Sequence, residues 1–276
     1  MYSQSSFLIV LGLFIFMLLA MEIGFRSGRR RQASVAEAIT QANSVLVSML
    51  GLLALLLAFT FSAALQRFED RSQTVVAEAN AIGTTYLRAR LLPGGMPDEV
   101  QALLRRYLDV RIQEGRVDST EPEFHESLLH QAKLMEAGLW SHAVKAAELD
   151  KSVVTSGLFI QSLNELIDTS TTRNTALNRQ VPEIVLLLMF ATIVLTTATL
   201  GYASGIAGHR VTLAAFVLLI LIALVVYLII DLDRPRRGVI QVSHESMLSL
   251  QQAIGAAQGH TVQPGSPPDA SQAPRR

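Results

Sequence analysis

Four apolar blocks constrain this chain more than any other feature of its sequence. They lie at residues 1–21, 38–66, 184–208 and 211–230, and none of them contains a charged side chain. About 20 apolar residues span a bilayer as a helix, so each block is long enough to cross a membrane. A cleaved signal peptide is the alternative for the first block, but arginines follow that block instead of preceding it. The sequence therefore predicts an all-α membrane protein with four transmembrane helices in two pairs.

A polar segment, 67–181, separates the two pairs and is predicted to be helical almost throughout. No helix breaker lies between Leu65 and Pro93, so the second transmembrane helix is expected to continue into this segment. Pro97 suits the first turn of the next helix, and a last helix is expected to begin near Ser152. Beyond Gln251 the tail has a disordered composition. We expect four parts: a first helix pair at 1–65, a helical polar domain continuous with the second helix at 66–182, a second helix pair at 183–232, and a membrane-proximal segment with a disordered tail at 233–276.

Composition excludes several classes of function. Only 17% of the residues are charged, against about 25% in soluble domains, and 23 basic residues balance 23 acidic ones, which gives no basic face for nucleic acid. The chain has no cysteine and no phosphate-binding loop or nucleophile motif. His125 and His130 are five residues apart, so on a helix they diverge by about 140° and cannot share a metal ion. We therefore expect no enzyme, no cofactor and no metal site.

The second apolar block carries a face of small and polar residues. At 100° per residue they cluster within about 80° of the helix circumference, whereas Leu53 and Leu57 lie on the opposite side. Such residues in lipid should face a water-filled path or a packing seam with another helix, and the pattern alone favours neither. Two large apolar side chains on this face favour the path, because hydrophobic constrictions gate pores by dewetting. The residues of the face are Ser44, Ser48, Gly51, Leu55, Phe59, Ser62, Gln66, Glu69, Gln73 and Asn80.

Small and hydroxyl residues suggest two further packing sites. In the third block, Gly201 and Gly205 lie one turn apart and predict close contact with another helix. Three threonines on the other side of that helix, Thr192, Thr196 and Thr199, are expected to donate to backbone carbonyls of their own helix or to neighbouring helices in preference to lining a pore. Residues 83–85, Gly-Thr-Thr, are unusual inside a helix and predict either tight packing against a neighbour or a bend.

Three sequence motifs resemble known families. Residues 59–63, FTFSA, followed by RFED at 67–70, resemble the F-x-x-S-A-x-x-x-R-F-x-x-acid run that ends the second membrane helix of bacterial bestrophins, although the acids here follow Arg67-Phe68 directly. Residues 78–88, EANAIGTTYLR, and 232–238, LDRPRRG, resemble the bacterial bestrophin-like family, and this likeness extends over about residues 20–250.

The resemblance implies a homo-oligomeric, most simply pentameric, ion channel with its pore lined by the second helix of each subunit. It implies a neck at Phe59, Leu55 and Gly51, of which Gly51 departs from the large apolar pattern. Asp231 and Asp233 do not form the acidic cluster of the bestrophin calcium clasp, so no calcium gate is expected. A non-conducting membrane scaffold or sensor whose helical domain binds a partner is the alternative. The expected partners are other copies of the chain, the lipid bilayer and permeant ions, with no nucleic acid.

Arginine placement gives two opposing indications of topology. Four arginines in the short first loop, Arg26, Arg29, Arg30 and Arg31, favour a cytoplasmic loop by the positive-inside rule. More arginines flank the membrane on the side of the polar domain, and the resemblance also places that domain inside. We expect a multi-pass protein of the bacterial inner membrane with a cytoplasmic helical domain. The 232–238 motif is interpreted as a membrane-boundary turn with arginines facing lipid headgroups, in preference to a ligand site.

Overall fold

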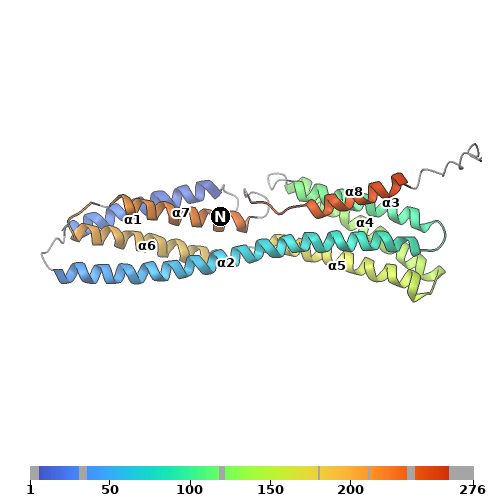
Figure 1. Ribbon diagram of the computed structural model, residues 1–276, viewed down its shortest axis with the longest axis horizontal. Coiled ribbons are helices and arrows are strands. Elements are labelled where there is room, and N and C mark those ends of the chain that lie inside the picture. The colour runs from blue at the N-terminus through green and yellow to red at the C-terminus, as the bar shows by residue number, and fades with distance from the viewer. Residues whose placement is uncertain are drawn as a thin grey trace, which may run out of the picture. The chain divides into compact units, whose positions relative to one another are not determined.

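The computed structural model describes residues 6–30, 36–117, 122–179, 181–210, 212–234 and 240–260, and within these ranges the chain is helical and has no strand (Figure 1). The helices are α1 (Ser6–Arg30), α2 (Ala36–Arg88), α3 (Met96–Arg116), α4 (Pro122–Leu149), α5 (Leu158–Asn178), α6 (Glu183–Ile206), α7 (Leu213–Asp233) and α8 (Glu245–His260), with short helical turns at Ala89–Leu91 and Val153–Gly157.

Four helical segments of the described chain are long and apolar enough to cross a membrane. They are Ser6–Arg30, Ile39–Leu91, Val153–Ile206 and Leu213–Asp233, and each contains most of one of the four apolar blocks of the sequence. The predicted all-α fold with four membrane-spanning helices is therefore confirmed. The predicted continuation of the second span is also confirmed, because α2 runs for 53 residues before the turn that precedes Pro93.

The chain divides into two compact units. The first contains Met1–Gln73 and Arg173–Val242, and the second contains Thr74–Thr172 and Ser243–Arg276. Helices α2 and α5 contribute residues to both units. The part boundaries expected from the sequence stay a prediction.

In the first unit, glycines bring α1 and α6 into backbone contact. A Cβ atom added at Gly201 would lie 2.0 Å from the Met21 carbonyl oxygen, and one added at Gly24 would lie 2.0 Å from the Ala198 carbonyl oxygen. Only glycine permits an approach this close. The close contact predicted for Gly201 and Gly205 is confirmed, and Gly24 and Gly28 supply its unpredicted counterpart on α1.

The threonines of α6 bond to the backbone of their own helix. Thr192 donates to the Leu188 carbonyl at 2.8 Å, Thr196 to the Thr192 carbonyl at 2.7 Å, and Thr199 to the Leu195 carbonyl at 2.9 Å. Each hydroxyl is thereby satisfied inside an apolar helix, as predicted.

In the second unit, α2 packs tightly against α8 and α5. Gly83 faces Leu250 of α8, where an added Cβ would lie 3.1 Å from a leucine methyl group. Thr85 donates to the Ser162 carbonyl of α5 at 3.0 Å. These contacts confirm tight packing at residues 83–85. Ser152 accepts from the Val154 backbone N–H at 3.3 Å and caps the helical turn Val153–Gly157, which leads into α5, so the helix start expected near Ser152 is confirmed.

The carboxy-terminal segment contains more helix than its composition predicts. Helix α8 continues to His260, so the expectation of disorder beyond Gln251 is wrong for residues 252–260, and residues 261–276 lie outside the described residues. Met247 and Ile254 are buried on one side of α8, and packing of that apolar side stabilises a helix whose polar residues are mostly good helix formers.

Candidate pore face on helix α2

Within the first unit, one side of α2 packs on the protein core. Leu53 and Ala64 are buried in an apolar cluster with residues of α1, α6 and α7, and Leu57 and Phe61 pack against the same cluster. Thr60 is buried on this side and donates to the Leu56 carbonyl at 2.7 Å. This is the side that the sequence places opposite the polar face.

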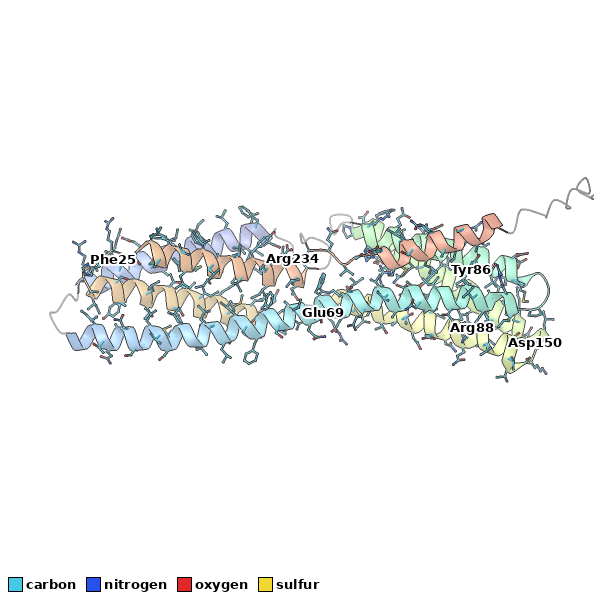
Figure 2. The ribbon with its side chains drawn as sticks, in the orientation of Figure 1. Phe25, Glu69, Tyr86, Arg88, Asp150 and Arg234 are labelled. Carbon is cyan, nitrogen blue, oxygen red and sulfur yellow. The ribbon has the colours of Figure 1, made fainter. Side chains whose placement is uncertain are left out.

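The predicted pore face lies on the exposed side of α2. The exposed fractions of Leu55 and Phe59 are 52% and 65%, and a Cβ added at Gly51 would meet nothing within 4 Å. The other predicted pore-lining residues of this unit, Ser44, Ser48, Ser62, Gln66, Glu69 and Gln73, are exposed as well. Glu69 is labelled in Figure 2. Asn80 belongs to the second unit and is exposed there. Their roles in a pore stay a prediction.

The polar groups of this face bond along α2 itself. Ser44 donates to the Thr40 carbonyl at 2.9 Å, and Ser48 donates to the Ser44 carbonyl at 3.0 Å. Gln66 donates to Asp70 at 3.0 Å. A hydroxyl that has donated its proton still offers lone pairs, so these oxygens can accept from water or contact a cation. The face therefore offers hydroxyl oxygens, an apolar section at Leu55 and Phe59, and the carboxylate of Glu69.

On the buried side of α2, the Arg71 side chain donates hydrogen bonds to backbone carbonyl oxygens. Its guanidinium donates to Ala176 at 3.3 Å and to Arg179 at 2.7 Å, at the carboxyl end of α5. It also donates to Leu232 and to Asp233, at the carboxyl end of α7, both at 3.1 Å. The exposed fraction of Arg71 is 1%. Helix carboxyl ends carry partial negative charge, so a cation is stabilised there.

The 232–238 motif is partly buried in protein. The Asp233 carboxylate accepts the Val181 backbone N–H, with distances of 3.2 and 3.0 Å to its two oxygens, and Asp231 accepts the Ile240 N–H at 3.0 Å. Arg234 donates to the Ser6 hydroxyl at 3.2 Å and is buried (Figure 2). The expectation that arginines of this motif face headgroups is therefore wrong for Arg234. Arg236 and Arg237 lie outside the described residues.

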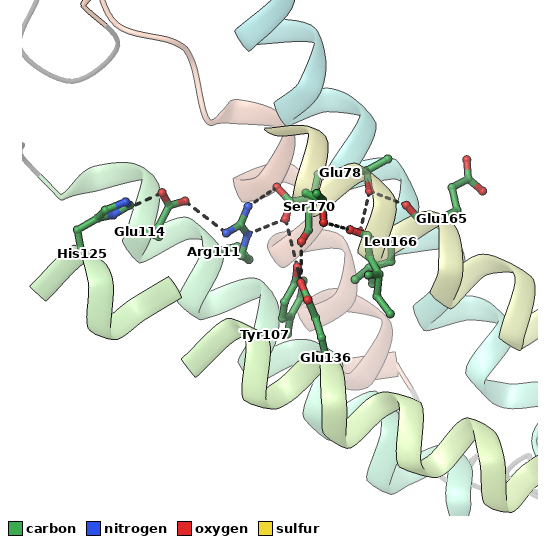
Figure 3. A network of polar contacts seen from close by, with 12 residues as sticks. Glu78, Tyr107, Arg111, Glu114, His125, Glu136, Glu165, Leu166 and Ser170 are labelled. Atoms are coloured by element: carbon green, nitrogen blue, oxygen red, sulfur yellow. Dashed lines mark hydrogen bonds and ion pairs between the residues drawn. The ribbon is translucent and has the colours of Figure 1, made fainter. Parts of the chain in front are cut away.

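A second polar network, in the other unit, was not predicted (Figure 3). Arg111 of α3 pairs with Glu78 of α2, with Nε–Oε1 at 2.6 Å and Nη2–Oε2 at 3.2 Å, and both side chains are fully buried. Arg111 also lies 3.7 Å from Glu114, whose other oxygen is 3.5 Å from His125 of α4. Glu78 stands 33 residues before Arg111, so helical periodicity could not pair them.

Tyr107 extends this network to a second residue of α4 and to helix α5. Its hydroxyl lies 3.3 Å from Glu78 and 2.9 Å from Glu136 of α4, which also accepts from Ser170 of α5 at 2.7 Å (Figure 3). Burial, reinforced by the charge of Glu78, raises the pKa of Tyr107 well above its usual value. Burial is the largest single influence on the pKa of Arg111 and lowers it, but the charges of Glu78, Tyr107 and Glu114 and the hydrogen bond to Glu78 together outweigh burial, so the net pKa is raised. Arg111 is therefore a permanent cation that compensates buried carboxylates.

These observations define the class of protein. Four apolar spans in an all-helical chain make this a multi-pass membrane protein. The chain belongs to the family of the Bestrophin-like domain, whose model matches residues 11–247. No relative among curated proteins matches the chain.

Solved structures of a bacterial bestrophin homolog from Klebsiella pneumoniae share the fold. One point variant is 17% identical with a TM-score of 0.65, covering 91% of this chain and 97% of that chain. Another is 17% identical with a TM-score of 0.62, covering 93% and 100%. A structure phased on zinc is 16% identical with a TM-score of 0.60, covering 91% and 97%. The predicted resemblance to bestrophins is confirmed at the level of the fold.

Proposed function

We propose that this protein is an ion channel formed by a ring of identical subunits, most simply five, with helix α2 of each subunit lining the pore. The observation that carries this proposal is the division of α2 into two sides. One side packs on the core through Leu53 and Ala64, whereas on the other side Leu55 and Phe59 are more than half exposed and a Cβ added at Gly51 would meet nothing within 4 Å. Membership of the bestrophin-like family supports the same conclusion.

An oligomer follows from the chemistry of the exposed side. Serine hydroxyls, an amide and the Glu69 carboxylate on an otherwise apolar helix are unfavourable against lipid, and they need protein or water. A closed ring about a symmetry axis turns the same side of every subunit inward, which removes all of these groups from lipid at once. The partners are accordingly other copies of the chain, the surrounding bilayer and the permeant ions.

In such a ring, Leu55 and Phe59 form the narrowest apolar section. They stand one turn apart on the exposed side, so each contributes one ring of large side chains. An ion in a narrow apolar ring has no polar partner, and the walls expel water. Gly51 has no side chain to contribute, so the neck has two apolar rings instead of three. We place the channel in the bacterial inner membrane, with the helical domain cytoplasmic and without cofactor or catalytic activity.

Single-channel recording of the purified protein in planar bilayers tests this proposal. Replacing Leu55 and Phe59 together by alanine should widen the neck and raise conductance or open probability. The matched control replaces Leu53 and Leu57, which face the core, and should change stability without raising conductance. A control variant that conducts better while the neck variant does not would mean that α2 turns its other side to the path.

Measuring both oligomer mass and ion conduction distinguishes the channel from the alternative function. A ring-sized particle in mild detergent that never conducts would favour a membrane scaffold or sensor whose helical domain binds a partner. A strict monomer would contradict both the pore and the neck.

A further inference from the structure

Helix α2 carries leucines on several sides of its membrane-spanning part, so burial of apolar side chains alone does not determine the rotation of the helix about its axis. Leu53 is buried and Leu57 partly so, yet Leu52 and Leu55 are more than half exposed. In a bilayer the lipid is as apolar as leucine, so burying one leucine instead of another gives little preference. A directional polar contact is needed to select the side that faces the core.

Arg71 provides that contact. At 100° per residue it stands about 200° from Gly51, on the same side of α2 as Leu53 and Ala64. Its planar guanidinium has donors in a fixed fork, and three of its nitrogens donate to four carbonyls on two other helical ends. Rotating α2 by even one residue position would move the fork away from all four acceptors.

One of the acceptor residues is itself held by a further contact. Asp233, whose carbonyl accepts from Arg71, uses its carboxylate to hold the Val181 backbone N–H at the start of the segment leading into α6. Arg71 therefore bonds where the carboxyl ends of α5 and α7 lie beside the segment leading into α6, all within the first unit. Buried polar groups are costly to leave unpaired, so this arrangement strongly disfavours any other rotation of α2.

We propose that Arg71 is the positioning residue that sets the rotation of α2 about its own axis. It thereby keeps Gly51, Leu55 and Phe59 on the side of α2 that faces away from the core of the subunit. The consequence for conduction rests on the proposed function, but the rotation itself does not. In this role Arg71 acts only through the helix that carries it. Its neighbour Arg67, one turn earlier, donates to the Ala63 carbonyl of α2 itself at 3.2 Å and, among the described residues, bonds to no other helix.

Single-cysteine reporters in this cysteine-free chain measure the rotation directly. Gln66→Cys places a thiol on the exposed side and Ala64→Cys places one on the buried side, about 200° away. In detergent-solubilised, assembled protein a hydrophilic thiol reagent should modify the first at least about tenfold faster than the second, because access controls thiol reaction. Adding Arg71→Met should bring this ratio towards one, whereas Arg67→Met, which removes the same charge, should preserve it.

A second variant, Arg71→Lys, keeps the test decisive if Arg71→Met does not fold. Lysine keeps the cation but lacks the planar fork, so it should assemble normally and give a ratio between those of the parent and Arg71→Met. Each variant is compared only at unchanged helical content and particle size. A parent-like ratio in folded Arg71→Met, or in Arg71→Lys if the methionine variant does not fold, would overturn the proposal. Conduction is recorded separately, so a protein that never conducts but shows the shifted ratio would retain the positioning role and lose only the channel.

Discussion

The buried pair of Glu78 and Arg111 allows a sharp test of how the second unit is held together. Replacing Arg111 by methionine keeps most of the side-chain volume but removes the cation from between two fully buried carboxylates, Glu78 and Glu114. Breaking a buried ion pair by removing one partner costs about 3–5 kcal/mol, because the remaining charge stays desolvated. For a unit of this size that corresponds to a loss of roughly 10–20 °C in melting temperature.

Trp140 is a suitable reporter for this experiment. It is the only tryptophan of the chain and lies on α4, within the same unit as Arg111, so fluorescence melting follows this unit. The matched control is Arg106→Met, the same substitution on the same helix at an exposed position, which should shift stability by no more than about 0.5 kcal/mol. The cost of Arg111→Met should shrink in acid, where protonation removes the uncompensated negative charge. Equal melting shifts for the two arginine variants would refute the structural role of the buried pair.

Three further outcomes follow from other parts of the molecule. Gly24→Ala should destabilise the first unit by about 1–3 kcal/mol in thermal denaturation, because its Cβ would collide with the Ala198 carbonyl, whereas Gly12→Ala, with nothing within 4 Å, should be neutral or stabilising. Because the pKa of Tyr107 is raised in the folded protein, its contribution to the stability of the second unit is complete below about pH 10 and is lost at higher pH, where the phenol ionises in the unfolded chain. Tyr107→Phe should therefore remove part of the loss of stability at alkaline pH, measured by Trp140 fluorescence. In intact cells an impermeant thiol reagent should modify Ser27→Cys and spare Glu126→Cys, and the reverse pattern would mean that the first-loop arginines determine topology.

Periodicity and breakers were sufficient to predict the helical architecture. Apolar length predicted the four spans, the absence of a breaker predicted the continuous α2, and the glycine spacing predicted one half of the α1–α6 contact. The other half was missed although Gly24 and Gly28 have the same four-residue spacing as Gly201 and Gly205, because they follow the first apolar block and lie among arginines that were assigned to the first loop. Composition likewise misjudged α8, whose stability comes from burying Met247 and Ile254 against other helices. Tertiary packing determines these features, and a local pattern does not contain it.

The polar contacts show where prediction from one sequence stops. A helical wheel places Arg71 on the apolar side of α2, so its burial was open to prediction: a cation on that side must meet acceptors. Which acceptors it meets was not open to prediction, because they are backbone carbonyls 105 to 162 residues away and every residue has one. The exposed side of α2 differs, since its candidate pore residues are defined by their own side chains and by one helix alone. The rotation of α2 therefore depends on tertiary contacts that cannot be predicted from one sequence. The side chains on its exposed face, by contrast, can be identified from the sequence alone.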